Sequence, residues 1–345
     1  MAEPLRLSLA CGDYAVTRPI IDGEVPIEGV ACTTLTAMDA ATRNWRFLRD
    51  RVFDVAEFSC SSYLPARDQG EKLVALPIFL HRRFRHGFIY INTSKGIRKP
   101  ADLIGRKVGV KTWQVSAILW ARGVLESEYG VPQRSIDWYA ELDEDVPFEP
   151  PAGLRYSKLP SDKSAETMLA EGELDALLLP NLIKPLLAGD PRVGRLFPDY
   201  KAEEARYYRK TGVFPIMHLV AMRRALVEAH PWLPGRLFRA FEHAKAIAMR
   251  RMADPTIAPL AWHGAAWDEE RDLLGPDPWE YGLTRNNRRA IETLVGYSLD
   301  AGLIRRRLTV EPSCVAIHQV FPAGSAIPAL LSGSASFFAG SENET

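Results

Sequence analysis

The fold class is decided by the stretch Lys107-Val108-Gly109-Val110-Lys111-Thr112-Trp113-Gln114-Val115 and the fifteen residues after it. The short apolar run at residues 107–110 predicts a buried strand. Thr112 can cap a helix that runs from about Val115 to Tyr129, and Gly130 is a typical helix stop. A strand, a loop and a helix in this order favour a parallel α/β architecture.

The same unit recurs on both sides of this stretch. Further strands are predicted at residues 5–10, 53–58, 88–91 and 175–179, and a helix at residues 165–171 that stops at Gly172. From His230 onward helical spacing dominates, with one apolar stripe along residues 237–247 and a second helix near residues 287–301. The chain is therefore predicted to be α/β with a mostly helical C-terminal third.

Length and charge restrict the class of protein. With 345 residues, the chain is long enough for about two domains of roughly 150 residues each. The 43 Lys and Arg residues balance 43 Asp and Glu residues, so the chain lacks the positive field that attracts nucleic acid or anionic lipid. Apolar residues at 47% and charged residues at 25% are the values of a globular chain. We therefore expect neither a nucleic-acid nor a membrane partner.

The sequence contains no recognisable membrane-spanning or secretory segment. No apolar run approaches the roughly 20 residues that span a bilayer, and Met1 to Ala10 lacks the charged and apolar regions of a secretory signal. The four cysteines are far apart and form no metal-type pair. A cytoplasmic protein with reduced thiols is expected. Residues 323–345 are small and polar, which predicts a flexible tail.

The familiar nucleotide, zinc-protease and serine-hydrolase motifs are missing from the sequence. What remains is a set of strand-to-loop junctions that carry polar side chains, and in open α/β sheets such carboxyl ends face the ligand crevice. At the first junction Asp13 lies in a Gly-Asp turn, which is common in any loop. At the second, Glu57 is followed by Ser59, Ser61 and Ser62, which can hold an anion at a helix N-terminus or simply cap the helix.

Two further junctions contain arginine and histidine. In the run His81-Arg82-Arg83-Phe84-Arg85-His86 the charges can form a solvated face, or the arginines can grip a carboxylate while His86 shuttles protons. His218 lies in an apolar strand, where it can be a core histidine or a catalyst. The local pattern leaves both alternatives open.

Long motifs resemble one known family, the 4,5-dihydroxyphthalate decarboxylases. They occur in the family's order, cover most of residues 5–308, and comprise Gly12-Asp13-Tyr14 with Thr17-Arg18-Pro19, Phe53 to Tyr63, Arg82 to His86, Trp120 to Val131, Tyr207 to His218, His230 to Pro234 and Tyr281 to Leu283. The chain departs from the family's pattern at His81, in the acidic and Pro-rich stretch from Glu141 to Pro151, and in the tail.

The wider resemblance is to type II periplasmic binding proteins, such as those for taurine and nitrate, on residues 99–110 and 168–176. It implies two α/β lobes that close over a ligand in a cleft between them. The expected division is residues 1–93 with 214–322 in lobe 1, residues 94–213 in lobe 2, and a tail at 323–345. The junctions described above would then meet in the cleft.

The family resemblance implies a carboxy-lyase of aromatic catabolism that removes one carboxylate from 4,5-dihydroxyphthalate without oxidation and gives protocatechuate. The substrate is then a small aromatic dicarboxylate. No cofactor is required in principle, although a divalent metal can assist, and a metal role for His86, His218 and Glu57 stays open. A homo-oligomer is compatible with the sequence. The alternative is a solute-binding protein or ligand sensor for a small organic anion, which the same fold also serves.

Roles follow for the residues at the junctions. We expect His86, with His218 second, to protonate the ring, and Asp13 or Glu57 to accept a hydrogen bond from a phenol. The residues expected to bind the substrate lie at the same junctions and are Arg18, Ser59, Ser61, Ser62, Tyr63, Arg82, Arg85, Thr112, Trp113 and Arg209.

Overall fold

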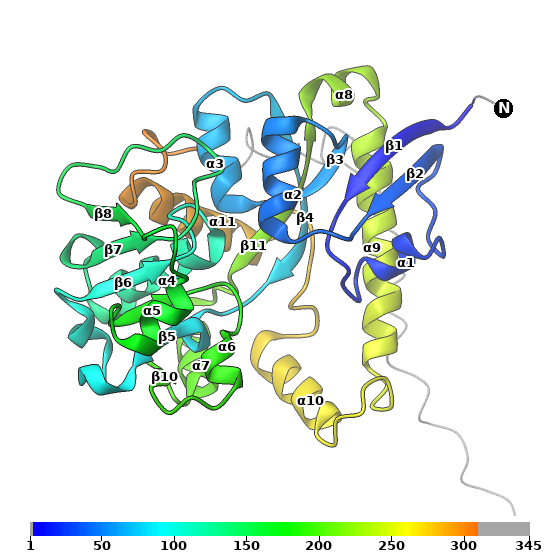
Figure 1. The fold of residues 1–345 in the computed structure, drawn as a ribbon. Coiled ribbons are helices and arrows are strands. Elements are labelled where there is room, and N and C mark those ends of the chain that lie inside the picture. Colours follow the sequence, from blue (N-terminus) through cyan, green and yellow to red (C-terminus); the bar gives the residue numbers. More distant parts are fainter. Residues whose placement is uncertain (1–2, 310–345) are drawn as a thin grey trace, which may run out of the picture.

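The computed structural model describes residues 3–309 of the chain. Two separate sheets form the centres of two lobes, each flanked by helices (Figure 1). The first sheet has the order β2-β1-β3-β11-β4. Its strands are β1 (Leu5–Ala10), β2 (Val30–Leu35), β3 (Val55–Ser59), β4 (Leu73–Arg82) and β11 (Ile216–Arg223). The second sheet has the order β10-β5-β9-β6-β7-β8. Its strands are β5 (Ile89–Asn92), β6 (Lys107–Val110), β7 (Asp137–Ala140), β8 (Arg155–Lys158), β9 (Ala176–Leu178) and β10 (Val193–Arg195).

The helices alternate with these strands along most of the chain. They are α1 (Arg18–Ile21), α2 (Ala40–Trp45), α3 (Cys60–Asp68), α4 (Ser116–Tyr129), α5 (Ala165–Glu171), α6 (Lys184–Leu187), α7 (Tyr200–Thr211), α8 (Arg224–Ala229), α9 (Leu233–Met252), α10 (His263–Leu274) and α11 (Arg285–Asp300). The α/β class and the two-lobed type II architecture are confirmed.

Both sheets are mixed, although the sequence favours parallel strands. In the first sheet β1, β2 and β3 are parallel, and β11 runs antiparallel between β3 and β4. In the second, β6, β7, β8 and β9 are parallel, while β5 pairs antiparallel with β9 and β10. Each antiparallel strand lies next to a crossing between the lobes, because the chain enters the new sheet from the opposite direction.

The chain passes from the first sheet to the second between Arg82 and Ile89, and returns between Gly212 and Ile216. The first crossing therefore precedes the expected boundary at residue 93, since β5 pairs within the second sheet. The chain re-enters the first sheet at β11, which begins at Ile216. Helix α11 contacts α4 as well as α3, so it joins the two lobes on one side.

Local signals explain where the helices end. Helix α4 stops at Gly130, whose φ of 65° suits glycine, and α7 stops in the same way at Gly212 with a φ of 64°. The side chain of Ser164 caps α5, as the Thr284 side chain caps α11. Thr112 was expected to cap α4 directly. Instead Val115 is the N-cap residue, and the Thr112 hydroxyl accepts a hydrogen bond from its backbone N–H.

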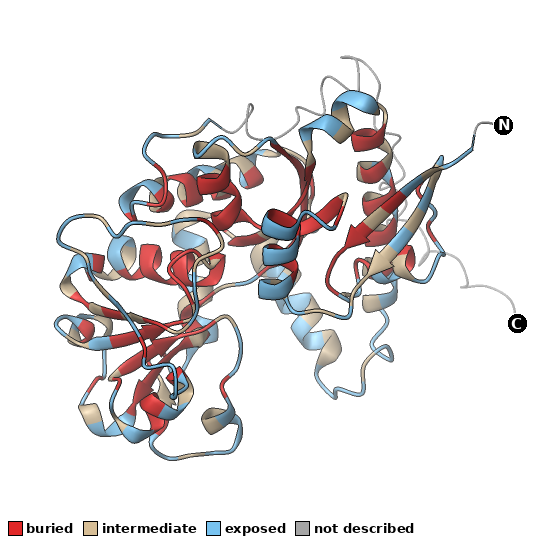
Figure 2. Ribbon diagram, turned by 45° about the horizontal axis from the view of Figure 1, so that its top comes forward, coloured by how far each residue is buried: buried red, intermediate tan, exposed pale blue. Residues whose placement is uncertain are grey.

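Burial follows the central strands of both lobes (Figure 2). Every residue of β3 is buried, and so is every residue of β4 except His81. Strands covered on both faces read as continuous apolar runs, which is why the sequence reveals them. The apolar stripe of α9 closes the first lobe, because Leu237, Phe241 and Ala244 are buried against it. The expected tail at 323–345 lies outside the described residues.

Candidate active site

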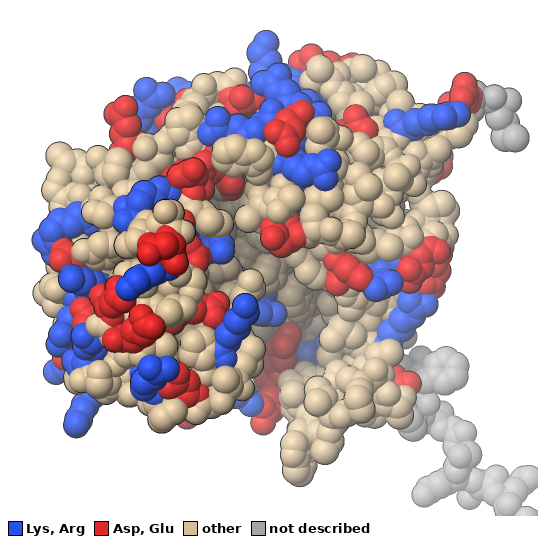
Figure 3. All heavy atoms as spheres, in the orientation of Figure 1, with Lys and Arg blue, Asp and Glu red and all other residues tan. Residues whose placement is uncertain are grey.

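The ends of four strands of the first sheet meet at one edge. β1, β3 and β4 finish there and antiparallel β11 begins there. In the register, His218 lies opposite Ser59 on one side and opposite His81 on the other, and Val220 lies opposite Glu57. Glu57 and His218 are therefore diagonal neighbours on the same face of the sheet. Figure 3 shows that the surface is hollowed between the two lobes.

Glu57 is completely buried, yet its carboxylate is well supplied with partners. Oε1 accepts hydrogen bonds from the Tyr14 hydroxyl at 2.9 Å and contacts His218 Nδ1 at 2.5 Å. Oε2 accepts a hydrogen bond from the Gly12 backbone N–H at 2.7 Å and forms an ion pair with Arg43 at 2.8 Å. A carboxylate has about four acceptor positions, so the site is saturated.

These partners decide the charge of Glu57. Burial alone raises the pKa of a carboxyl group, but here His218, Arg43 and the Gly12 N–H outweigh it and hold the pKa of Glu57 below its usual value. The carboxylate stays ionised in the folded protein. It also fixes the ring of His218, because Nδ1 faces Glu57 and Nε2 is left for another partner.

His218 is partly accessible, as are Tyr14 and His81 of the same cluster. The side chain of His218 is 13% exposed, and within residues 3–309 its Nε2 atom has no hydrogen-bond partner. The ring of His81 lies beside it, with centroids 5.0 Å apart, and Tyr14 lies 5.9 Å from His81. Burial, together with the positive charges of His218 and Arg85, lowers the pKa of His81 to about 2, so His81 is neutral. The pair of Glu57 and His218 is thus the part of the cluster that can carry a proton.

The structure separates the three expected arginines. Arg85 is buried at the join between the lobes: its Nη1 donates to the Pro180 carbonyl of the second lobe at 2.9 Å. Arg82 instead points into the first lobe, where it donates to Asn287 and to the Glu280 carbonyl. Arg18 is half exposed and pairs with Asp13. Strand alternation does not bring Arg82 and Arg85 together either, because residues three apart point to opposite faces, and β4 in any case ends at Arg82.

His86 does not join the Glu57 cluster. Its ring is packed among Tyr129, Phe197 and Tyr207, with Glu204 at 3.9 Å. None of these residues contacts Glu57 or His218. Burial lowers the pKa of His86 to about 4, so its ring is neutral near pH 7. The expected proton donor is therefore enclosed by aromatic rings near the crossing between the lobes.

The serines of the second junction meet the second lobe. Ser116, the first residue of α4, places its hydroxyl 2.9 Å from that of Ser59 and 3.0 Å from that of Ser61, and Ser61 also donates to the Gln114 carbonyl. Ser62 donates to Asp145 at 2.8 Å. The Ser59 side chain makes no capping bond to α3. The cluster joins the N-termini of α3 and α4 across the two lobes.

Four other expected substrate ligands have different positions. Tyr63 is buried in the core of the first lobe, and Thr112 is occupied as a capping residue. Trp113 is fully buried, donates to the Ala301 carbonyl and stacks on Arg122 at 3.1 Å. Arg209 is exposed on α7. Trp113 thus supports the second lobe rather than a ligand surface.

Sequence reasoning overlooked three residues of the cluster. Tyr14 belongs to the motif Gly12-Asp13-Tyr14, and its phenolic hydroxyl, two residues after Gly12, was a usable signal. Arg43 gave no signal, because it belongs to α2 and no local pattern links it to Glu57. His81 was noted as a departure from the family pattern, but β4 was not predicted as a strand.

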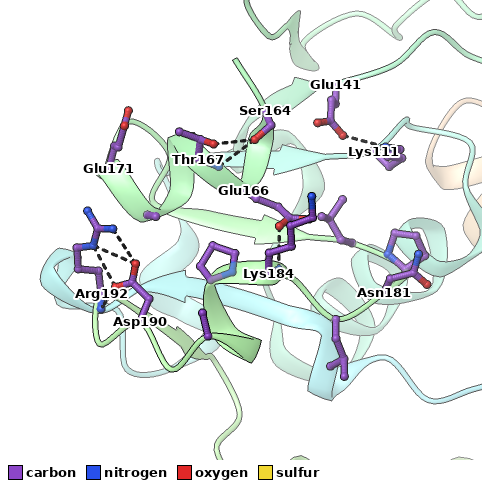
Figure 4. Close-up of a pocket in the computed structure, with 16 residues that line it drawn as sticks. Lys111, Glu141, Ser164, Glu166, Thr167, Glu171, Asn181, Lys184, Asp190 and Arg192 are labelled. Carbon is purple, nitrogen blue, oxygen red and sulfur yellow. Dashed lines mark hydrogen bonds and ion pairs between the residues drawn. The ribbon is translucent and has the colours of Figure 1, made fainter. Parts of the chain in front are cut away.

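A separate cavity of about 660 Å³ lies in the second lobe. Figure 4 shows Lys111 and Glu141, which follow β6 and β7, at one end and Asp190 with Arg192 at the other. The residues that line it do not include Glu57, His81 or His218. Across residues 3–309, no three His, Cys, Asp or Glu side chains are grouped as metal ligands. None of the helices in that range has the length and apolar character needed to cross a membrane.

Solved structures with similar folds are binding proteins and an enzyme. The aliphatic sulphonate binding protein SsuA of Escherichia coli superimposes with a TM-score of 0.55 at 12% identity, covering 90% of this chain and 97% of that one. SsuA of Xanthomonas axonopodis pv. citri, bound to MOPS, gives 0.54 at 16% identity over 91% and 99%. The desulfurization enzyme DSZB gives 0.52 at 15% identity over 90% and 96%. At these identities the likeness establishes the fold.

Sequence relatives are more specific. A scan against models of known protein families finds no match. A 4,5-dihydroxyphthalate decarboxylase of Comamonas testosteroni is 36% identical over 313 residues, which cover 88% of this chain and 94% of the relative. One of Pseudomonas putida is 34% identical over 212 residues, or 59% and 82% of the two chains. The protein studied here is therefore a member of the 4,5-dihydroxyphthalate decarboxylase family.

Proposed function

We propose that the protein is a carboxy-lyase that converts 4,5-dihydroxyphthalate to protocatechuate and carbon dioxide in the cleft between its lobes. The observation that carries this proposal is the buried Glu57 carboxylate that holds His218 by Nδ1 and leaves Nε2 without a partner. The family relationship gives the substrate class.

The substrate is suited to proton-driven decarboxylation. Each carboxyl-bearing carbon of 4,5-dihydroxyphthalate has a hydroxyl para to it, so a proton added at that carbon creates a cation which the oxygen lone pair delocalises. The bond to the carboxylate then breaks, its electron pair returns to the ring, and carbon dioxide leaves. One proton is consumed and the ring becomes aromatic again.

His218 is the group that we assign to this proton. Its Nε2 delivers the proton to the carboxyl-bearing carbon of the substrate. The imidazole of His218 is then neutral and takes up a new proton from solvent. Glu57 remains ionised and stabilises the charged imidazole before transfer. The roles of Arg43, Gly12 and Tyr14 are to hold Glu57 in place.

Binding of the dicarboxylate requires cations and neutral donors at the cleft. We assign Arg85 to the retained carboxylate, because it is the expected arginine that reaches both lobes. We assign the hydroxyls of Ser59, Ser61 and Ser116, which form one cluster, as the neutral donors. The retained carboxylate should be held more tightly than the departing one, since equal binding of both would not lower the barrier.

We propose that the reaction needs no organic cofactor, because the para hydroxyl itself accepts the positive charge. A divalent cation that orients the diol would be revealed by loss of turnover after chelation, together with elemental analysis of the purified protein. We also propose a cytoplasmic setting, supported by the free thiols of Cys11 and Cys32.

The central experiment incubates the protein with 4,5-dihydroxyphthalate and follows protocatechuate by chromatography. His218→Asn should lower kcat by about 10²–10⁴-fold, the typical contribution of a general acid, and should leave substrate binding nearly unchanged. His86→Asn should keep most of the turnover, and His243→Asn, at an exposed position on α9, is the matched control.

If His218→Asn keeps full turnover and His86→Asn loses it, His86 is the proton donor and the assignment to His218 is wrong. The sulfonate-binding neighbours favour a second candidate, a solute-binding protein. Tight binding of the dicarboxylate without any release of carbon dioxide would establish that function instead.

A further inference from the structure

His81 is an unusual residue in its strand. It is the one residue of β4 that is not buried, and it lies where the strand reaches the cleft. Its ring pairs across the sheet with that of His218.

The polar atoms of His81 are unoccupied. Its Nδ1 is buried without a hydrogen-bond partner, and its Nε2 has no partner within the described part of the chain. The neighbouring rings contact it at centroid distances of 5.0 Å for His218 and 5.9 Å for Tyr14. Because Nδ1 is enclosed by the protein, Nε2 is the nitrogen of His81 that a ligand in the cleft can reach.

The surroundings determine what kind of group His81 is. Burial most strongly disfavours a positive charge on it, and the neighbouring His218 and Arg85 act in the same direction, while Glu57 opposes them. A neutral imidazole has one donor and one acceptor nitrogen. His81 is therefore suited to accept a hydrogen bond, and unsuited to deliver a proton.

We propose that His81 accepts a hydrogen bond from the substrate hydroxyl para to the departing carboxylate, and so selects hydroxylated substrates. This inference rests on the proposed function. A benzene ring that lies across both imidazoles brings the protonated carbon to His218 and the opposite hydroxyl to His81. The centroids of the two imidazole rings are 5.0 Å apart, which is comparable to the distance from a benzene carbon to the oxygen of the hydroxyl para to it.

The hydrogen bond would act on the barrier as well as on binding. When the ring carbon is protonated, positive charge spreads to the para hydroxyl and makes its proton more acidic. The hydrogen bond to His81 then strengthens, so it stabilises the transition state more than the bound substrate. No proton needs to leave the hydroxyl, and electron flow remains within the ring.

The test compares His81→Phe and His81→Gln with the wild-type protein. His81→Phe keeps an aromatic ring and removes the acceptor, whereas His81→Gln restores an acceptor oxygen. His243→Phe, at an exposed position on α9, is the control. Two quantities are measured for each: kcat/KM for 4,5-dihydroxyphthalate, and the inhibition constant of phthalate, which has both carboxylates but no hydroxyl.

His81→Phe should lower kcat/KM by about 10²-fold, as the loss of one preorganised polar contact to a transition state does, while phthalate inhibition stays within about threefold. His81→Gln should recover part of the loss. The inference is overturned if His81→Phe retains wild-type kcat/KM, or if kcat/KM and phthalate inhibition fall together, since a purely structural role would affect both.

An inactive wild-type protein would overturn the proposed function and leave this contact testable. Calorimetry would then compare the binding of 4,5-dihydroxyphthalate and phthalate to the same proteins. Loss of the preference for the hydroxylated ligand in His81→Phe supports the contact, and an unchanged preference overturns it.

Discussion

Glu57 and Arg43 form the most deeply buried ion pair of the site, with side chains 0% and 2% exposed. Replacing Glu57 with Gln removes the counter-charge and leaves the guanidinium buried. Such a change typically costs about 3–5 kcal/mol. We therefore expect Glu57→Gln to lower the free energy of unfolding by that amount, measured by urea denaturation at pH 7. Asp13→Asn, which breaks an exposed pair with Arg18, should change it little.

The stabilisation by Glu57 should depend on pH in a definite direction. The pKa of Glu57 is lower in the folded chain than its usual 4.5, so the folded state binds a proton less readily than the unfolded state. The stabilisation is complete above pH 4.5 and is lost as the pH falls below that value. The difference between wild-type and Glu57→Gln proteins should shrink in the same range. A constant difference down to pH 3 would show that the ionised carboxylate is not its source.

At this scale the sequence placed Glu57 and His218 at strand-to-loop junctions, where α/β proteins bind their ligands, and the family resemblance supplied their catalytic roles. Sequence reasoning preferred His86 over His218, and the structure encloses His86 among aromatic rings. The motif at residues 82–86 shows which side chains follow one another along the chain. It does not show that the chain turns after Arg82, and this turn places Arg85 and His86 in different surroundings.

At the scale of elements, the segment between β7 and β8, residues 141–154, ties the lobes together. Glu144 accepts hydrogen bonds from the backbone of Trp113 and Gln114 in its own lobe. Asp145 accepts one from Ser62 of the other lobe, and the Pro147 carbonyl accepts another from Gln69.

Asp145 makes this connection sensitive to pH. Burial, with a contribution from Glu144, raises its pKa from 3.8 to about 6, although Ser62 and Asn44 act in the opposite direction. The folded state holds this proton more tightly than the unfolded state, so the contribution of Asp145 to stability is full below pH 3.8 and is lost as the pH rises through 6.

Asp145→Asn should therefore be more stable than the wild-type protein at pH 7.5, by on the order of 3 kcal/mol, because the pKa of Asp145 is raised from 3.8 to about 6 and each pKa unit corresponds to about 1.36 kcal/mol. The advantage should diminish by pH 4. Calorimetric Tm values at both pH values measure it. Asp143→Asn, at an exposed neighbour paired with Lys158, is the control and should give no such gain. A lower Tm of Asp145→Asn at pH 7.5 would contradict the expectation.

Elements with strong apolar runs or clear caps were predictable, including β1, β6, α4 and α5. The short edge strands β8 and β10 were not. The residues of β8 are largely exposed, and β10 has only three residues, so neither carries a clear pattern of a half-buried strand. Strand direction was not predictable either. Whether β11 runs with or against its neighbours depends on where the chain re-enters the sheet, and local sequence carries no record of that.

The serine cluster indicates how the whole molecule must move. Ser59, Ser61 and Ser116 are buried and hydrogen-bonded to one another across the two lobes. A substrate that uses these hydroxyls has to replace those bonds. We therefore expect the lobes to separate at this point for substrate entry and product release, as in other enzymes that close over their ligands.

A reversible cross-link tests this motion. The hydroxyls of Ser61 and Ser116 are 3.0 Å apart, close enough for two thiols at these positions to form a disulfide with little backbone movement. The oxidised Ser61→Cys/Ser116→Cys double variant should lose most of its turnover of 4,5-dihydroxyphthalate, and dithiothreitol should restore it to the level of the reduced double variant. The single variants, treated in the same way, separate loss of the hydroxyls from loss of motion. Peptide mass spectrometry confirms the linkage, because Cys60 is a neighbouring thiol. If the linked protein turns over as fast as its reduced form, the substrate reaches His218 without separation of the lobes at α3 and α4, and the cleft must open along another edge.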